Sequence, residues 1–292
     1  MGYLYLAISL LAGSTKGFMG KRISTEVSGY RQSVFVNLIR MVICILISAG
    51  VLLMEIWGRG ITIDGPALLF GALAGVMISV FTVTWLLSVR HGAFMLISVA
   101  QMFGVVVTVI CSAIVFYESI TFLQVVAVVV LMTAVVIMGS YSRAIKGRLS
   151  MSAVILLTVC GLSSGLYDFS QKLFTQYSVA SVSTLNLLTY FISSVVLCGV
   201  FFLAKEKGCT VENGLFRKTF VSVLIMSVCL FLNSYFKALT TMYLPATQIY
   251  PMYQAGGLII SALMSAVFFK ERITLRCVVG MILAFVAILL LK

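Results

Sequence analysis

Ten long apolar runs, separated by short polar breaks, make up most of this chain. Each run approaches or exceeds the ~20 residues that a helix needs to cross the hydrocarbon core of a bilayer. Helices are the expected spanning element, because open strands would leave backbone groups unpaired in lipid. The pattern predicts an all-α membrane protein whose ten transmembrane helices cover residues 3–20, 32–54, 66–88, 93–117, 121–141, 151–172, 182–203, 217–240, 245–269 and 273–291.

Two of these stretches, residues 91–139 and 244–292, are similar enough to be copies of one unit. At a constant offset of 153 residues they share 12 identical residues over 49 positions. An apolar composition raises the chance of matching Ala or Val, but it does not explain the pairing of Gln101 with Gln254 or of Glu118 with Glu271. An internal repeat of this kind predicts two five-helix halves, residues 1–145 and 146–292.

The composition agrees with a membrane protein. The chain of 292 residues is 62% hydrophobic and 10% charged, whereas soluble domains are about 45–50% apolar and about 25% charged. A net charge of +12 could suggest nucleic-acid binding. We exclude that class because most basic residues lie in the breaks between apolar runs, where they act as orientation signals.

The basic residues are distributed unevenly between the two predicted sides of the membrane. The breaks after the odd-numbered helices contain 14 of the 20 Lys and Arg residues, and only Arg59, Lys172 and Lys292 fall on the other side. Because cytoplasmic loops carry the positive excess, we expect those breaks inside the cell and both termini outside the plasma membrane. Five helices per half then give halves of opposite orientation, which is the inverted-repeat plan of secondary transporters.

Short motifs spread along the chain carry a resemblance to a known family. The matching residues are Gly13, Ser14, Lys21, Arg40, Ala238, Leu239, Pro251, Phe269, Glu271, Ile273, Thr274 and Gly280. With them the chain resembles the EamA group of the drug/metabolite transporter superfamily, over essentially its whole length. The first half keeps Glu118 and Thr121 but has Ser98, Ala127 and Ala12 where the family often has proline, glycine and tryptophan. The resemblance implies ten helices and a transport role, but no substrate, because the family handles amino acids, sugars, amines, nucleotide sugars and drugs.

Two polar stripes occupy equivalent positions of the repeat. Each keeps a glutamine, a glycine and two hydroxyl residues on one helix face: Gln101, Gly104, Thr108 and Ser112, and Gln254, Gly257, Ser261 and Ser265. At a rise of 1.5 Å per residue each glutamine lies ~12–13 Å from its own membrane surface, so both approach the middle of a ~30 Å core. Substrate sites of inverted-repeat transporters lie there. The alternative is that these groups only bond helices together.

Other polar and charged side chains inside the helices extend this candidate site. Tyr250 and Tyr253 lie near the face of Gln254, and Pro251 frees a backbone carbonyl one turn earlier. Charged residues inside a membrane are costly and usually functional. We therefore expect a substrate site drawn from Gln101, Gln254, Tyr250, Tyr253, Arg40, Asn37, Lys16, Asn186, Tyr190 and Asn233.

Several of the charged and aromatic side chains allow a second interpretation. Lys16 and Lys237 can extend to the membrane surface, and for Lys237 this snorkelling is the preferred interpretation. Asp168 is the one acidic residue well inside a helix, so it is the candidate for proton coupling. A basic partner, Lys172 or Lys237, would instead keep it ionised. Trp85 belongs either to an interfacial belt or to the cavity.

Three pairs of glycines, each with a spacing of four residues, predict close contacts between helices. The pairs are Gly13 with Gly17, Gly71 with Gly75, and Gly161 with Gly165. Plain helix packing is the preferred interpretation of all three.

These observations favour a secondary transporter of a small polar metabolite, working by alternating access. The basic excess of Lys16, Arg40 and Lys237 favours an anionic or zwitterionic substrate such as an amino acid, and proton coupling stays open. A lipid-carrier flippase, or a subunit of one, is the alternative. An intramembrane enzyme or a channel is disfavoured, because the single histidine lies in a loop and no metal-ligand cluster or filter-like segment occurs. We expect no cofactor or metal, a small-molecule substrate and the lipid bilayer as partners, and an undetermined oligomeric state.

Overall fold

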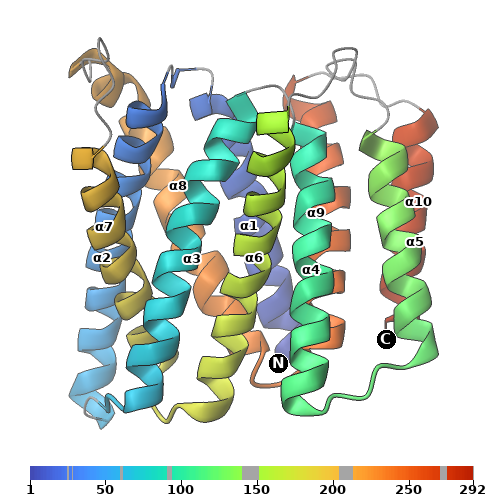
Figure 1. Cartoon of the computed structure of the whole chain (residues 1–292), viewed down its shortest axis with the longest axis horizontal. Helices are drawn as coiled ribbons and strands as arrows, with labels where there is room; N and C mark the ends of the chain where they lie inside the picture. The colour runs from blue at the N-terminus through green and yellow to red at the C-terminus, as the bar shows by residue number, and fades with distance from the viewer. Residues whose placement is uncertain are drawn as a thin grey trace.

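The protein is a bundle of α-helices (Figure 1). The computed structural model describes residues 1–24, 26–27, 29–59, 62–90, 94–139, 151–203, 213–269 and 275–291. Regular structure in these ranges is helical throughout. The helices are α1 (Gly2–Ser24), α2 (Tyr30–Arg59), α3 (Gly65–Arg90), α4 (Phe94–Phe116), α5 (Phe122–Gly139), α6 (Met151–Tyr177), α7 (Val182–Leu203), α8 (Asn213–Thr240), α9 (Ala246–Phe269) and α10 (Leu275–Leu290). Each corresponds to one predicted range, so the all-α prediction is confirmed.

Four helices contain described stretches long and apolar enough to cross a membrane: Tyr30–Glu55, Gly65–Ser88, Val182–Leu203 and Thr219–Thr240. Shorter apolar stretches occur at Ala100–Phe116, Phe122–Ile137 and Val278–Leu290. The four long stretches indicate a membrane protein. Glycine, hydroxyl and charged residues interrupt the apolar sequences of α1 and α6.

Apolar side chains cover much of the outside of the bundle, and polar side chains lie inside it. Large hydrophobic residues such as Leu46, Leu53 and Phe191 are more than half exposed. Arg40, Asn186 and many serines and threonines are instead almost fully buried. A soluble protein of this size rarely leaves contiguous apolar faces uncovered, so this distribution agrees with lipid as the surrounding solvent.

The two halves of the chain interleave. Helix α1 packs against α8, and α3 packs against α6 and α7, so the central contacts join residues far apart in sequence. Figure 1 shows α2 and α7 together at one edge of the bundle and α5 and α10 at the other. The two termini lie at the same end. For brevity we call this end, where α3 and α9 begin, the terminal end.

A glycine contact brings α4 and α6 unusually close together. A Cβ atom added at Gly165 would lie 2.4 Å from the carbonyl oxygen of Gly104, and one added at Gly161 would lie 2.2 Å from that of Ala100. The approach lets the Thr108 hydroxyl on α4 donate to the Gly165 carbonyl on α6, at 2.8 Å. Small residues at such crossings replace the hydrophobic driving force that lipid does not provide. The packing interpretation of Gly161 and Gly165 is confirmed.

We expect Gly165→Ala to destabilise the protein by about 1–3 kcal/mol, because its methyl group would push against backbone rather than against a flexible side chain. Gly199→Ala on α7 is the matched control, since a Cβ there meets nothing within 4 Å and alanine has the higher helix propensity. Thermal unfolding of the purified protein in detergent compares the two variants. Equal midpoints for both variants would contradict the close α4–α6 contact.

Candidate functional site

A cavity of about 110 Å³ lies inside the bundle, between the two halves of the chain. Its walls come from α1, α2, α3, α4, α8 and α9, and are formed by Gly13, Ser14, Lys16, Gly17, Arg40, Phe81, Thr82, Trp85, Gln101, Met226, Tyr253, Gln254, Gly257 and Leu258. This volume is somewhat below the ~150 Å³ of an engineered protein cavity that binds benzene. The cavity therefore fits a molecule of only a few non-hydrogen atoms.

Both repeat-related glutamines line this cavity. Gln101 lies ~10 Å along α4 from its first residue, and Gln254 lies ~12 Å along α9 from its own. Because α4 ends and α9 begins at the terminal end, the two side chains reach the cavity from opposite ends of the bundle. Neither carboxamide has a hydrogen-bond partner among the described residues. Two amides that face a cavity without protein partners are available to a ligand.

Arg40 is a buried guanidinium that a neighbouring amide holds in place. Its side chain is 2% exposed, and its Nη1 donates to Asn37 Oδ1 at 2.6 Å. Asn37 in turn donates to the backbone carbonyls of Ser33, at 2.9 Å, and Thr82, at 3.3 Å. Asn37 was expected to bind substrate, but the structure turns it towards Arg40 and α3 instead of towards the cavity. The Arg40 Nε has no hydrogen-bond partner in the described part of the chain.

Lys16 provides the second positive charge of the cavity. Its Nζ lies 6.0 Å from the centre of the Phe81 ring, and no described carboxylate pairs with it. The snorkelling alternative for Lys16 is therefore not the arrangement seen here, because the side chain lines the cavity. Gly17, one residue later, has open space where a Cβ would lie, so its role is to leave room in the cavity. The packing interpretation expected for Gly17 is wrong.

Aromatic side chains of α3 form a wall that sequence reasoning identified only in part. The sequence allows Trp85 a place in either a membrane belt or the cavity, and the structure places it in the cavity wall, 8% exposed. Phe81 and Thr82 line the same wall. No repeat or charge singles out these two residues in the sequence. The face of α3 that meets α1 could have been predicted only with knowledge of the helix arrangement.

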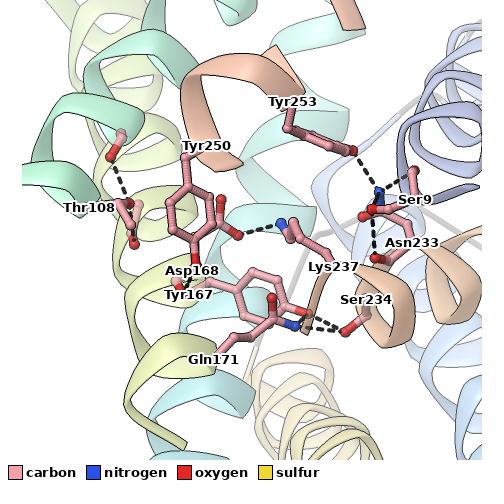
Figure 2. Close-up of polar contacts among 12 residues, drawn as sticks. Ser9, Thr108, Tyr167, Asp168, Gln171, Asn233, Ser234, Lys237, Tyr250 and Tyr253 are labelled. Atoms are coloured by element: carbon pink, nitrogen blue, oxygen red, sulfur yellow. Dashed lines mark hydrogen bonds and ion pairs between the residues drawn. The ribbon is translucent and has the colours of Figure 1, made fainter. Parts of the chain in front are cut away.

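Tyr253 connects the cavity to a layer of hydrogen bonds beneath it, on the side of the terminal end. Its ring lines the cavity, and its hydroxyl accepts a hydrogen bond from Asn233 Nδ2 at 2.6 Å. Asn233 also donates to the Ser9 carbonyl at 2.8 Å, and Ser9 Oγ donates back to the Asn233 carbonyl at 3.0 Å. Figure 2 shows these groups from α9, α8 and α1 meeting at one point. A Cβ at Gly13 would overlap the Tyr253 hydroxyl, so this glycine makes the contact possible.

A buried ion pair lies in the same layer. Lys237 Nζ and Asp168 Oδ1 are 2.5 Å apart, and both residues are less than a tenth exposed (Figure 2). The lysine also lies 5.2 Å from the ring centre of Tyr253 and 5.4 Å from that of Tyr167. The snorkelling interpretation of Lys237 is wrong, because desolvation of its ammonium is offset by a carboxylate inside the bundle. The alternative pairing of Asp168 with Lys237 is confirmed.

Three remaining candidates lie in contacts between helices rather than in the cavity wall. The Tyr250 hydroxyl donates to the backbone carbonyl of Asp168 at 2.7 Å. Asn186 Oδ1 accepts a hydrogen bond from Ser234 Oγ at 2.6 Å, and Tyr190 is fully buried in the apolar core between α2, α3, α6, α7 and α8. Their polar groups are used within the bundle, which separates them from Gln101 and Gln254.

The two polar stripes of the repeat differ in how they are used. On α4, Gly104 and Thr108 contact α6, and Ser112 Oγ is buried without a hydrogen-bond partner among the described residues. On α9, Gly257 lines the cavity. The side chains of Ser261 and Ser265 lie outside the described residues. Each stripe therefore places its glutamine in the cavity, while the Thr108 hydroxyl bonds α4 to α6.

Carboxylates hold the terminal end of the bundle together. Glu118 accepts hydrogen bonds from the backbone N–H groups of Ala246 and Thr247, at 3.3 and 3.4 Å, and pairs with Lys172 at 3.4 Å. The carboxylate thus caps the N-terminus of α9, where the helix dipole favours negative charge. Asp64, between α2 and α3, accepts a hydrogen bond from Ser178 Oγ at 2.7 Å, which lowers the pKa of its carboxyl group. These bonds join loops of both halves.

Comparisons with known proteins add support for the fold alone. No protein-family model matches the chain, and no curated protein matches its sequence. One solved structure that resembles it, described only as the crystal structure of a protein, has a TM-score of 0.74 over 99% of this chain and 95% of the other. The two sequences are 10% identical. The arrangement of helices therefore occurs in an experimentally determined structure.

The Asp168–Lys237 pair leads to a test of its role in stability. We expect Asp168→Asn alone to destabilise the protein by about 3–5 kcal/mol, because it leaves the Lys237 ammonium buried without a carboxylate. Asp168→Asn combined with Lys237→Met removes both charges and should recover much of that loss. Thermal unfolding midpoints of the two single variants and the double variant measure the coupling. Additive effects of the two substitutions would contradict a paired, buried geometry.

Proposed function

We propose that this protein is a secondary transporter, which moves a small polar organic molecule across the plasma membrane by alternating access. The observation that carries this proposal is the cavity, because several of the polar groups in its wall lack partners among the described residues. Arg40 Nε and Ser14 Oγ are buried and unpaired among the described residues, and Lys16, Gln101 and Gln254 join them in the wall. Groups of this kind are costly in a membrane interior unless a ligand satisfies them.

The packing of the helices supports two inverted halves, residues 1–145 and 146–292. Exchanging each helix of the first half with the helix five positions later converts the contact of α1 with α8 into that of α6 with α3. The same exchange converts the α4–α6 contact into α9–α1 and the α3–α7 contact into α8–α2. It leaves the α2–α7 and α5–α10 pairs unchanged. Such an exchange is expected of two copies related by a two-fold axis in the membrane plane.

The layers beneath the cavity support an alternating-access cycle. On the side of the terminal end, the cavity is followed by the Asn233–Tyr253 and Asp168–Lys237 contacts, and then by the Glu118 cap of α9. This conformation is closed at that end. In the repeat, Glu271 occupies the position of Glu118. Glu271 itself lies outside the described residues.

The size of the cavity favours a small solute over the lipid-carrier flippase alternative. A volume of about 110 Å³ lies well below the 300–1,000 Å³ of pockets that hold drug-sized ligands, and a lipid headgroup with its chains is larger still. The alternative remains testable, because a flippase would move a labelled lipid in the same vesicles that measure solute uptake.

We expect the purified protein in liposomes to take up a small organic solute, and Gln254→Ala and Gln101→Ala each to lower uptake at subsaturating substrate by about 2–10-fold. Each substitution removes one hydrogen bond to the solute, worth about 0.5–1.5 kcal/mol. A panel of radiolabelled amino acids, organic acids, amines and nucleosides identifies the solute, with and without a proton gradient. Uptake by the two variants equal to that of the parent would place the site elsewhere.

Gln248→Ala is the matched control for this experiment. Gln248 is a partly exposed glutamine of the same helix, α9, and lies outside the cavity wall. Its substitution removes the same amide group from the same element, so it should leave uptake unchanged. Parent protein that moves no solute of the panel, under either gradient condition, would contradict the proposed transport function.

The charge distribution leads to a prediction of orientation. We expect epitope tags at both termini to be reachable from outside intact cells, because the loops at the other end contain most of the Lys and Arg residues. A cysteine introduced at position 146, in a background without native cysteines, should react with a membrane-impermeant maleimide only after the cells are opened. Reaction of that cysteine in intact cells would contradict the predicted orientation.

A further inference from the structure

The charged residues that line the cavity are all positively charged. Two of its wall residues, Lys16 and Arg40, are cationic, and none of the wall residues is acidic. Three described acidic residues have partners outside the cavity. Asp168 pairs with Lys237, Glu118 pairs with Lys172, and Glu55 accepts a hydrogen bond from Ser183 at 2.7 Å. Among the described residues, no carboxylate forms an ion pair with either cation.

Unpaired cations in such a place need a partner from outside the chain. Removing an ion from water costs several kcal/mol even after relaxation, and two like charges at one cavity raise that cost. Charged side chains within membranes pair with one another, with backbone carbonyls or with a ligand. Because the first solution is not used for Lys16 and Arg40, the charge balance favours a ligand that brings negative charge.

The donors are arranged for an oxyanion. Asn37 Oδ1 accepts a hydrogen bond from one Nη of Arg40 and fixes the guanidinium. The Arg40 Nε belongs to the planar donor set that matches a carboxylate, and it has no acceptor in the part of the chain that the structure describes. Ser14 Oγ is a further buried hydroxyl without a partner among the described residues. Asn37 is thus a positioning residue, since it keeps the guanidinium in place without itself lining the cavity.

The remaining wall is neutral. Trp85, Phe81 and Leu258 are apolar or aromatic, and the two glutamines provide uncharged donors and acceptors. None of the described wall residues has a carboxylate that could bind an ammonium group, and the two cations repel such a group. A zwitterionic amino acid would therefore find cationic partners for its carboxylate but no anionic partner for its ammonium group.

We infer that the cavity is a site for a small organic anion, in which Arg40 and Lys16 bind its carboxylate and the glutamines contact its neutral polar part. This inference rests on the proposed transport function and narrows its substrate to carboxylates with a net negative charge. The volume of about 110 Å³ restricts these to short-chain acids.

Binding to the full chain in detergent tests the charge preference directly. Trp85 lines the cavity, so its fluorescence, in a Trp57→Phe background, reports a bound ligand. The probes are propionate and lactate, their neutral amides, propylamine, and alanine as the zwitterion. We expect the two carboxylates to change the fluorescence and to raise the thermal unfolding midpoint, with the amides and the amine at least tenfold weaker and alanine weaker than lactate.

Variants identify the groups that bind the anion. Arg40→Lys keeps the charge but loses the planar guanidinium, and we expect about tenfold weaker binding of lactate. Lys16→Gln removes the charge of a half-buried side chain and should weaken lactate binding by at least as much. Arg22→Gln is the matched control, because Arg22 is an exposed basic residue of the same helix as Lys16, outside the cavity. Its affinity for lactate should equal that of the parent.

Three outcomes would overturn the anion site: amide or amine binding as tight as carboxylate binding, parent-like affinity of both Arg40→Lys and Lys16→Gln, or displacement of lactate by chloride or phosphate at equal concentration. Liposome uptake separates this inference from the transport proposal. Uptake of a neutral or cationic solute without carboxylate binding would refute the anion site alone. Tight carboxylate binding without uptake of any solute would refute transport alone.

Discussion

The constraint on which this structure depends is that polar groups inside a membrane must find their partners within the protein. The bundle meets this requirement for many of its buried polar groups. Lys237 has Asp168, Asn233 has Ser9 and Tyr253, and the hydroxyl groups of many buried serines and threonines donate to backbone carbonyls of their own helix. The Arg40 Nε differs from the other buried atoms that have no hydrogen-bond partner among the described residues, because it belongs to a charged group in the cavity wall. Polar side chains thus hold the bundle together, and those left unpaired in the cavity wall are available to a ligand.

Close helix contacts determine where these polar groups can meet. Glycine at positions 104, 161 and 165 lets α4 and α6 approach until the Thr108 hydroxyl reaches across. Gly13 similarly gives the Tyr253 hydroxyl space beside α1. Gly17, by contrast, faces open space. Glycine therefore has two uses here: it allows close helix contact in one place and leaves space in the cavity in another. Which of the two applies depends on whether a neighbouring helix lies against it.

This distinction explains how far the sequence could predict the molecule. The helices follow from apolar runs alone, because run length and polar breaks are local properties. The pairing of Gln101 with Gln254 in one cavity follows from the repeat, which carries information about position in the membrane. The partner of Lys237 depended on how α6 and α8 face each other, and hydropathy does not encode this, so snorkelling was wrongly preferred. Phe81 and Thr82 were missed for the same reason, since their face of α3 is an ordinary apolar face until α1 is placed beside it.

The hydrogen bonds of Tyr253 show how the cavity and its closed end are linked. The ring of this residue is part of the wall that a ligand would contact, while its hydroxyl belongs to the layer that joins α9 to α8 and, through Asn233, to α1. Any separation of α8 from α1 and α6 at this layer would break the Asn233–Ser9 and Lys237–Asp168 contacts together. A movement of the Tyr253 ring would in turn change the hydrogen bond that its hydroxyl accepts from Asn233. The cavity wall and the contacts between α9, α8 and α1 therefore share one side chain, so a change in either is felt by the other through direct contact.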